Sequence, residues 1–248
     1  MKNFYIITNY AKDENQKITR RIAKCLEYYG MNCILCEKNE REEVIPGTIP
    51  ADIDCALVIG GDGTFIQASR LLFGHDVPML GINMGTLGYL TEVEVHNVEE
   101  AIAQLVRGDY TIENRMMLEG EVVKSNGDVV EIPESLNEIA ISKNSFGVVR
   151  FDAIVNEKLI NSYTADGILV CTPTGSTAYN LSCGGPIVDP TAEIITLTPI
   201  APHTVINRSL ILSDDSVVEI LDYVEQEMLK KLKEIQYETD WIIYSYME

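Results

Sequence analysis

Short apolar runs alternate with helix-spaced hydrophobic positions over the first hundred residues of the chain. The runs predict buried strands, and the segments between them, where apolar residues recur every three or four positions, predict amphipathic helices. The predicted strands cover residues 4–8, 32–36, 56–59 and 78–82, and the predicted helices cover 13–29, 65–73 and 98–106. Because strands that alternate with helices form parallel βαβ units, this part is predicted to be an α/β domain with a doubly wound sheet.

The pattern changes near residue 110, after which strand-like runs and tight turns replace the helices. The sequence Ser-Asn-Gly-Asp at residues 125–128 lies between two apolar runs and is typical of a hairpin turn. Further strands are predicted at 147–155, 168–172, 194–198, 209–212 and 217–221. The chain is therefore divided into an α/β domain (1–110), a β-rich domain (111–221) and an atypical C-terminal tail (222–248).

The tail carries two further patterns. Apolar residues at helical spacing predict an amphipathic helix over residues 222–236, which packs on the domain or on a partner. Residues 241–246 are aromatic-rich and resemble a strand.

The charge of the chain limits its partners. The formal net charge is -19, with 38 acidic residues against 19 basic ones. Such a chain has no long-range attraction for nucleic acid or for anionic membrane surfaces. A phosphate site must therefore be built locally, from backbone N–H groups, a few cations and bound Mg²⁺.

The cysteines and the N-terminus point to the cytoplasm. The six cysteines are scattered, and Cys33 and Cys36, although spaced as C-x-x-C, lie in an apolar run without a second pair that would complete a zinc site. The N-terminus lacks a signal-peptide pattern, and no apolar stretch reaches the roughly 18 residues of a membrane helix. A cytoplasmic protein with reduced thiols and no membrane partner is expected.

The strongest candidate for chemistry is the sequence Gly-Gly-Asp-Gly-Thr at residues 60–64, which follows a predicted strand and precedes a helix. Glycines let backbone N–H groups approach a phosphate, and a helix N-terminus favours anions. The sequence matches neither the P-loop nor the standard dinucleotide fingerprint. Asp62 in this loop is a turn or cap residue, a metal ligand or a general base.

Two further segments are weaker when each is taken alone. Residues 81–90 follow a strand and carry three glycines, which suits either a ligand loop or a flexible connection. Asn137 and Glu138 precede an apolar run and could bind sugar hydroxyls or form a solvated turn.

A fourth segment is rich in small polar residues. Asp166 and Gly167 are followed by a strand and then by Thr-Pro-Thr-Gly-Ser-Thr-Ala-Tyr at residues 172–179. Such residues fill a core poorly but offer many hydrogen-bonding groups at close range. The segment is therefore either a loop that recognises ribose, phosphate or amide groups or an ordinary polar loop.

Taken together, these segments resemble the NAD kinase family over roughly residues 1–220. The resemblance rests on residues 60–64, 81–90, 137–138, 166–167 and 172–179, and on the sequence PIAPHTVINRSL at 199–210. The Gly-Gly-Asp-Gly-Thr sequence is shared with diacylglycerol and sphingosine kinases, and phosphofructokinases have a similar loop. The threonine-rich segment that follows Asp166 and Gly167 is far more specific.

The resemblance implies an α/β N-terminal domain with a parallel sheet and a β-rich C-terminal domain, with the active site in the interdomain cleft. It implies transfer of a phosphoryl group from ATP, or from polyphosphate, to the 2′-hydroxyl of the adenosine ribose of NAD, giving NADP. Mg²⁺ or another divalent cation would accompany ATP, NAD would be the substrate, and the protein would be a homodimer or homotetramer.

The resemblance also implies roles for individual residues. Asp62 would be the catalytic general base and, with Gly63, would contact NAD. The backbone of Gly60, Gly61, Gly63 and Thr64 would approach the ATP phosphates. The other implied NAD contacts are Asn137 and Glu138 at the ribose hydroxyls and adenosine, Asp166 at the nicotinamide end, and Thr174, Ser176, Thr177, Ala178 and Tyr179 along the pocket. His203 and Arg208 are further candidates near the phosphates, and no residue is assigned as a direct metal ligand.

Two other functions fit part of the sequence. A lipid kinase of the same superfamily would share residues 60–64, but the threonine-rich segment and the negative charge disfavour it. A sensor that binds NAD or NADP without catalysis is suggested by the tail, which replaces strands and a glycine-containing loop that family members have there. The retained Asp62, Asn137, Glu138 and Asp166 favour an enzyme.

Overall fold

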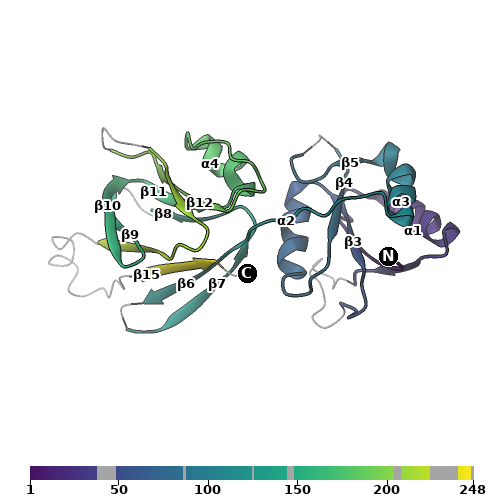
Figure 1. The fold of residues 1–248 in the computed structure, drawn as a ribbon, viewed down its shortest axis with the longest axis horizontal. Helices are drawn as coiled ribbons and strands as arrows, with labels where there is room; N and C mark the ends of the chain where they lie inside the picture. The colour runs from purple at the N-terminus through teal and green to yellow at the C-terminus, as the bar shows by residue number, and fades with distance from the viewer. Residues whose placement is uncertain are drawn as a thin grey trace. The chain divides into compact units, whose positions relative to one another are not determined.

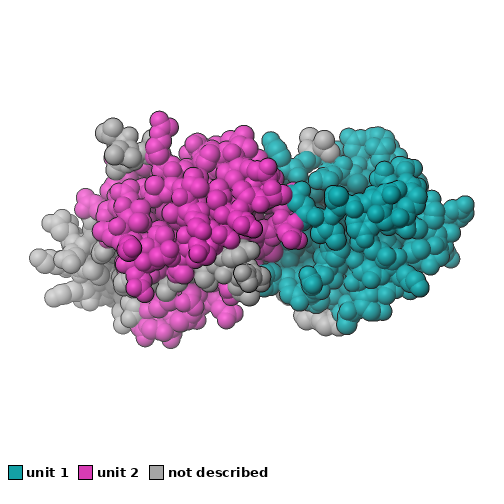
Figure 2. Space-filling model, viewed as in Figure 1, with its two compact units in different colours: residues 1–113 teal, residues 114–248 magenta. Residues whose placement is uncertain are grey.

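The structure is a computed structural model that describes residues 1–37, 49–85, 88–124, 126–143, 148–203, 208–223 and 240–246. The chain forms two compact units, unit 1 (Met1–Glu113) and unit 2 (Asn114–Glu248) (Figure 2). The division falls close to the change in sequence pattern near residue 110.

Unit 1 is a five-stranded parallel sheet with helices on both faces. Its strands are β1 (Asn3–Thr8), β2 (Asn32–Leu35), β3 (Cys55–Gly60), β4 (Met79–Asn83) and β5 (Val93–Glu94). Its helices are α1 (Lys17–Tyr28), α2 (Asp62–Leu71) and α3 (Val98–Arg107), with 3-10 turns η1 (Glu14–Gln16) and η2 (Val95–Asn97). The strand order β2-β1-β3-β4-β5 places β3 at the centre. The predicted α/β domain with a parallel sheet is confirmed.

Two apolar clusters hold this sheet between its helices. Phe4, Leu57 and Ile82 face α1 and α3, where they pack against residues such as Ile22 and Ile102. The opposite face of the sheet packs against α2. Figure 1 shows α1 and α3 together on one side and α2 on the other. Every residue of β3 is buried, so its carboxyl end is held rigidly from both sides.

Helix α1 begins later than its hydrophobic pattern predicts, at Lys17 instead of Asp13. Asn15 and Gln16 have positive φ angles, which interrupt the helix there. The buried Asp13 carboxylate instead accepts hydrogen bonds from the backbone N–H groups of Ile18 and Thr19, both at 2.9 Å. Asp13 thereby satisfies N–H groups of the first helical turn, as an N-cap residue would.

Unit 2 is built from antiparallel sheets. Its strands are β6 (Leu118–Lys124), β7 (Val129–Ser135), β8 (Glu138–Ser142), β9 (Val149–Val155), β10 (Lys158–Ala165), β11 (Gly167–Cys171), β12 (Ile194–Ile200), β13 (Leu210–Ser213), β14 (Val218–Tyr223) and β15 (Asp240–Tyr246). A 3-10 turn, η3 (Thr174–Thr177), and a short helix, α4 (Tyr179–Ser182), lie between β11 and β12. The sheet orders are β10-β9-β14-β15-β6-β7 and β13-β12-β11-β8. The predicted β-rich C-terminal half is confirmed.

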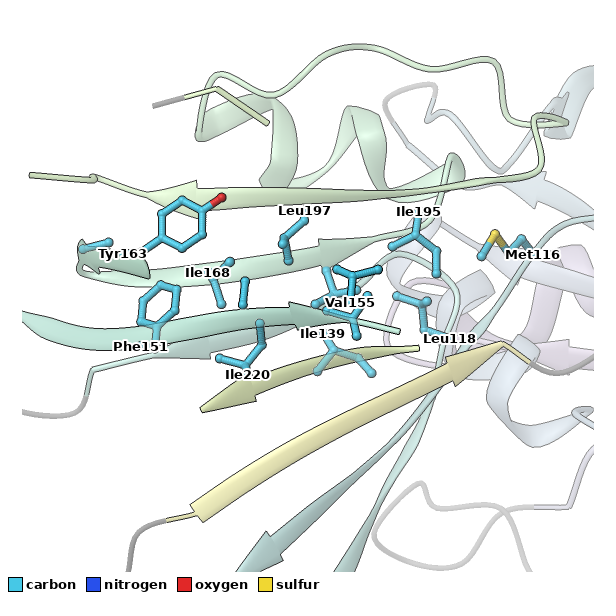
Figure 3. Close-up of a cluster of buried hydrophobic side chains, with 14 residues drawn as sticks. Met116, Leu118, Ile139, Phe151, Val155, Tyr163, Ile168, Ile195, Leu197 and Ile220 are labelled. Carbon is cyan, nitrogen blue, oxygen red and sulfur yellow. The ribbon is translucent and has the colours of Figure 1, made fainter. Parts of the chain in front are cut away.

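One continuous apolar core joins the two sheets of unit 2. It contains Phe151 and Ile220 from the larger sheet and Ile168, Val170 and Leu197 from the smaller one (Figure 3). Inward and outward residues alternate along each strand, so the apolar residues of the two sheets meet face to face. The face of β11 away from this core carries Cys171 and Leu169, which are also buried.

The end of the chain differs from the predicted helical tail. Asp222 and Tyr223 belong to strand β14, because the pairing of β14 with β9 continues through Phe151 and Arg150. The predicted helix at 222–236 is therefore wrong at its first two residues, and residues 224–236 lie outside the described residues. The strand predicted at 241–246 is confirmed as β15, which pairs with β14 and β6.

A membrane-spanning helix does not occur in the described part of the chain, where no helix is both long and apolar enough to cross a bilayer.

Asp13 provides a direct test of how helix α1 is held. Replacing Asp13 with Ala should lower the free energy of unfolding by about 1–2 kcal/mol, because N–H groups of the first turn lose their acceptor. Urea denaturation measures this, and Glu14→Ala, at an exposed neighbouring position, is the control. Equal stability of the two variants would contradict this role.

The contribution of Asp13 should also depend on pH. Burial works to raise the pKa of Asp13, but hydrogen bonds from Thr19, Ile18 and Lys17 outweigh it and lower the pKa. A lowered folded-state pKa stabilises the protein above the pKa of the unfolded chain, and this stabilisation is lost as the pH falls through the folded-state value. The gap between wild type and Asp13→Asn should accordingly shrink under acid conditions.

Candidate active site

The Gly-Gly-Asp-Gly-Thr segment in unit 1 joins the central strand directly to a helix. Strand β3 ends at Gly60, Gly61 is extended, and α2 begins at Asp62. The carbonyl of Gly61 accepts hydrogen bonds from the N–H groups of Thr64 (2.9 Å) and Phe65 (3.1 Å). Asp62 is thus the first residue of the helix, three residues earlier than the predicted start at Phe65. A carboxylate in the first turn interacts favourably with the helix dipole.

The first and third glycines of this segment have different surroundings. A Cβ on Gly60 would overlap the buried side chain of Thr64, so glycine is needed there for close packing. A Cβ on Gly63 would meet no atom within 4 Å, and Gly63 is exposed. The surface at Gly63 is therefore open to a ligand, whereas Thr64 is buried.

The Asp62 carboxylate is held by the segment that follows β4. Its Oδ2 accepts a hydrogen bond from the N–H of Tyr89 (2.9 Å), and its Oδ1 accepts from the N–H of Leu90 (3.1 Å) and the hydroxyl of Thr91 (3.3 Å). Gly88 allows this contact, because a Cβ at that position would overlap the carboxylate. The glycine segments at 60–64 and 81–90 are thus parts of one structure, although Thr86 and Leu87 lie outside the described residues.

This geometry fixes the direction of the carboxylate without using all of its acceptor capacity. Two carboxylate oxygens offer about four acceptor positions. Oδ1 accepts two hydrogen bonds and Oδ2 only one within the described part of the chain. Oδ2 can therefore accept one more proton donor, such as a hydroxyl group, while the loop keeps Asp62 in place.

Unit 2 brings Asn137 and Glu138 against the threonine-rich turn. The N–H of Thr172 donates to the carbonyl of Asn137 (2.9 Å), and the Thr172 hydroxyl donates to the carbonyl of Leu136 (2.6 Å). A Cβ on Gly175 would overlap the backbone of Asn137, so glycine allows the turn to approach this closely. The described structure therefore places Asn137 and Glu138 in a packed junction and not in a solvated turn.

The threonine-rich turn has a buried side and an accessible side. Ser176 is 0% exposed, and its hydroxyl donates to the carbonyl of Val188 (3.3 Å) and accepts from the N–H of Val188 (3.0 Å). Thr174 is also buried, so both residues have a structural role here that the sequence does not predict. Thr177 and Ala178 are half-buried and Tyr179 is 42% exposed, which leaves these three within reach of a ligand.

Glu138 is a half-buried carboxylate with incomplete hydrogen bonding. Its Oε2 is buried and has no hydrogen-bond partner in the described part of the chain. Burial raises the pKa of Glu138, and the hydrogen bond from the backbone N–H of Tyr179 only partly opposes this. Such a group is costly to fold and well suited to bind hydroxyl donors from a ligand.

Asp166 lies at the other end of the same strand pair. Strands β8 and β11 pair antiparallel, with Glu138 opposite Cys171 and Ser142 opposite Gly167. Four residue steps of about 3.3 Å put Asp166 roughly 13 Å or more from Glu138 along the strands. Asp166 instead forms an ion pair with Lys143, with 2.6 Å between Oδ1 and Nζ. A ligand that reached both carboxylates would have to be extended.

The two units do not supply a protein-built metal cluster among the described residues. No group of three or more His, Cys, Asp or Glu side chains there could hold an ion. His203 and Arg208 are both exposed. Sequence patterns miss Thr91 and Lys143, which contact the two predicted aspartates, because both contacts join residues more than twenty positions apart.

Comparisons with known proteins match both parts of the chain. The model of the ATP-NAD kinase N-terminal domain matches residues 30–110, and that of the ATP-NAD kinase C-terminal domain matches residues 136–237. The NAD kinase of Lachnospira eligens is 42% identical over 227 residues, covering 89% of this chain and 77% of that protein. The NAD kinase of Agathobacter rectalis is 38% identical over 248 residues, covering 97% and 85%.

Two crystal structures share the fold. Yeast NADH kinase complexed with NADH superposes with a TM-score of 0.80 at 24% identity, covering 100% of this chain and 81% of that one. An NAD kinase from Archaeoglobus fulgidus in complex with ATP superposes with a TM-score of 0.70 at 22% identity, covering 99% and 90%.

The contact between Gly88 and Asp62 can be tested by a double-mutant cycle. Gly88→Ala should destabilise the wild type by about 1–3 kcal/mol, because the new methyl group displaces the carboxylate from its hydrogen-bond donors. In an Asp62→Ala background the methyl group has room, so the same substitution should cost much less. Chemical denaturation of the four proteins measures this, and equal costs in both backgrounds would disprove the contact.

The burial of Glu138 predicts a pH-dependent gain in stability on its removal. Since its pKa is raised in the folded state, the carboxylate stabilises the fold only while protonated, and this contribution is lost as the pH rises through the folded-state pKa. Glu138→Gln should therefore raise the free energy of unfolding at neutral pH, with the gain shrinking on acidification. The exposed Glu131→Gln is the control, and destabilisation by Glu138→Gln at neutral pH would contradict the assignment.

Proposed function

This chain belongs to the NAD kinase family, and we propose that Asp62 is the general base with which it phosphorylates NAD to NADP with ATP. The observation that carries this assignment is the anchored Asp62 carboxylate, whose Oδ2 retains room for a hydroxyl donor. The hydroxyl concerned is the 2′-hydroxyl of the adenosine ribose.

The reaction follows from this geometry. The 2′-hydroxyl donates a hydrogen bond to Oδ2 of Asp62, and the proton passes to the carboxylate as the 2′-oxygen attacks the γ-phosphorus. A bond forms between the 2′-oxygen and phosphorus, the bond from phosphorus to the β–γ bridging oxygen breaks, and ADP leaves. Tyr89, Leu90 and Thr91 keep the carboxylate in one orientation, so catalysis depends mainly on positioning.

Unit 2 supplies the residues for NAD in this proposal. Asn137 and Glu138 receive the ribose hydroxyls and the adenosine, and Thr177, Ala178 and Tyr179 line the ligand. Asp166 receives the nicotinamide end. The separation of Glu138 from Asp166 along β8 and β11 supports an extended dinucleotide, which has a nucleoside at each end. Thr174 and Ser176 shape the turn from its buried side.

The donor phosphates belong to the other unit in this proposal. Backbone groups of Gly61, Gly63 and Thr64, at the N-terminus of α2, receive the ATP phosphates. Mg²⁺ would be carried mainly by those phosphates, which suits a described structure without a carboxylate cluster, and it would neutralise charge on the transferred group. Polyphosphate is an alternative donor with the same chemistry.

We infer a cytoplasmic enzyme that works as a homodimer or homotetramer. The scattered cysteines, all present as free thiols in the described structure, support a reducing compartment. The acidic surface supports small-molecule substrates over nucleic acid.

The function is tested with purified protein, NAD, Mg²⁺ and either ATP or polyphosphate. Wild type should form NADP, and Asp62→Asn should reduce kcat by about 10²–10⁴-fold because the general base is lost. Calorimetry should show that Asp62→Asn still binds NAD. Glu92→Gln, at an exposed position after the same loop, is the matched control and should keep full activity.

Three other results would contradict the role of Asp62 or indicate a different function. Unchanged kcat in Asp62→Asn would remove Asp62 from the reaction. Binding of NAD by wild type without formation of NADP from either donor would indicate a sensor. Phosphorylation of diacylglycerol but not NAD would indicate a lipid kinase.

A further inference from the structure

Lys12 lies beside the glycine segment at 60–64, although it is distant in sequence. It follows β1, which pairs in parallel with β3, so both segments leave the carboxyl edge of the same sheet. The Lys12 Nζ is 3.5 Å from the position that a Cβ on Gly61 would occupy. Ligands of open α/β sheets bind at this edge. The ammonium group therefore stands next to the N-terminus of α2.

The charge of Lys12 has no partner among the residues that the structure describes. Its ammonium group has no hydrogen bond or ion pair in the described structure, whereas several other cations there are paired. Arg21 forms an ion pair with Glu99, and Lys143 forms one with Asp166. In a chain of net charge -19, a cation that has no partner in the described ranges and lies beside a glycine-rich turn is a local positive site of the kind that phosphate binding requires.

A second, independent observation at the same edge of the sheet concerns Asn83. Asn83 ends β4 in register with Gly60 at the end of β3. Its side chain points to the face of the sheet that α2 covers, because Leu80 and Ile82 occupy the other face. Asn83 is 4% exposed, and neither Nδ2 nor Oδ1 has a hydrogen-bond partner in the described part of the chain.

The unsatisfied Asn83 amide has a consequence for the edge as a whole. A buried amide without partners costs about 1–3 kcal/mol, so its presence calls for a reason. A polar group of a ligand that binds at the turn and rearranges the adjoining segment provides such a reason. Lys12, from the β1 side, and Asn83, from the β4 side, flank the turn that leaves β3.

We propose that Lys12 binds the phosphate groups of the ATP donor at the Gly60–Thr64 turn. The inference rests on the proposed function and adds a side chain to a phosphate site otherwise made of backbone groups. It also resolves an electrostatic conflict, because the Asp62 carboxylate repels an incoming triphosphate and Lys12 offsets that repulsion. A lysine ammonium is a mobile point charge on a flexible stem, so it can follow the transferred phosphoryl group.

The test measures binding of ATP with Mg²⁺, in the absence of NAD, by calorimetry. Lys12→Ala should weaken ATP affinity by roughly tenfold or more, as expected for a lost charge-assisted hydrogen bond, while NAD affinity stays unchanged. Lys12→Arg should retain most of the affinity. In the kinase assay, Lys12→Ala should raise KM for ATP and leave KM for NAD unaltered. Thermal unfolding should be unchanged, because Lys12 is exposed.

Lys17→Ala is the matched control for non-specific attraction of ATP to basic surface. Lys17 lines an open cavity of about 620 Å³ on α1 together with Arg20, Arg21 and Lys24. Equal ATP affinity in wild type and Lys12→Ala, or a greater loss in Lys17→Ala, would overturn the proposal. So would an equal loss of ATP and NAD binding in Lys12→Ala. These results are separate from the proposed function, which fails only if wild type forms no NADP or Asp62→Asn keeps its kcat.

Discussion

The hydrogen bonds that hold the Asp62 carboxylate are the interaction on which the rest of this site depends. A side chain at the first residue of a helix is normally free to rotate. At Asp62, however, the loop after β4 supplies three hydrogen-bond donors, from Tyr89, Leu90 and Thr91. Gly88 makes room for the carboxylate. The segments that follow two neighbouring strands, β3 and β4, thus fix the orientation of the Asp62 carboxylate. Because β3 is fully buried, the backbone that carries Asp62 is held rigidly.

An acidic protein that handles phosphates must place its positive charge locally. The helix N-terminus at α2, the exposed backbone at Gly63 and the Lys12 ammonium group are concentrated at one sheet edge, while the overall charge of the chain is -19. Polar atoms of Asn83 and Glu138 have no hydrogen-bond partner in the described ranges of the chain, which costs stability at both places. One lies in unit 1 and one in unit 2, each beside a segment that sequence patterns associate with ligand binding.

Sequence patterns predict the elements that depend on local spacing. Strands β1 to β4 and helices α1 to α3 follow from hydrophobic runs and periodicity, and β15 follows from its aromatic-rich sequence. The glycine turn follows from its place after a buried run. Strand β10 is harder to predict, since polar residues such as Asn161 and Ser162 interrupt the apolar pattern. Helix α2 starts at Asp62 because Gly61 is extended. At residue 222 the predicted helix is replaced by strand β14, which pairs with β9.

The parts of the site that sequence patterns miss are contacts between distant segments. Nothing local indicates that Asp62 bonds Tyr89, that Lys143 pairs with Asp166 or that Ser176 is buried against Val188. These contacts depend on strand order and register, which only the folded chain establishes. Residue types at a site can therefore be recognised from sequence, but which side chains face a ligand and which support the turn cannot.

The central claim is that the anchored Asp62 carboxylate meets the ribose hydroxyl that becomes phosphorylated. A crystal structure with NAD and a non-hydrolysable ATP analogue measures this directly. The 2′-oxygen of the adenosine ribose should lie about 2.6–3.2 Å from Oδ2 of Asp62, with Oδ1 still accepting hydrogen bonds from Leu90 and Thr91. A 2′-oxygen that lies beside a different base, beyond hydrogen-bonding reach of Asp62, would contradict it.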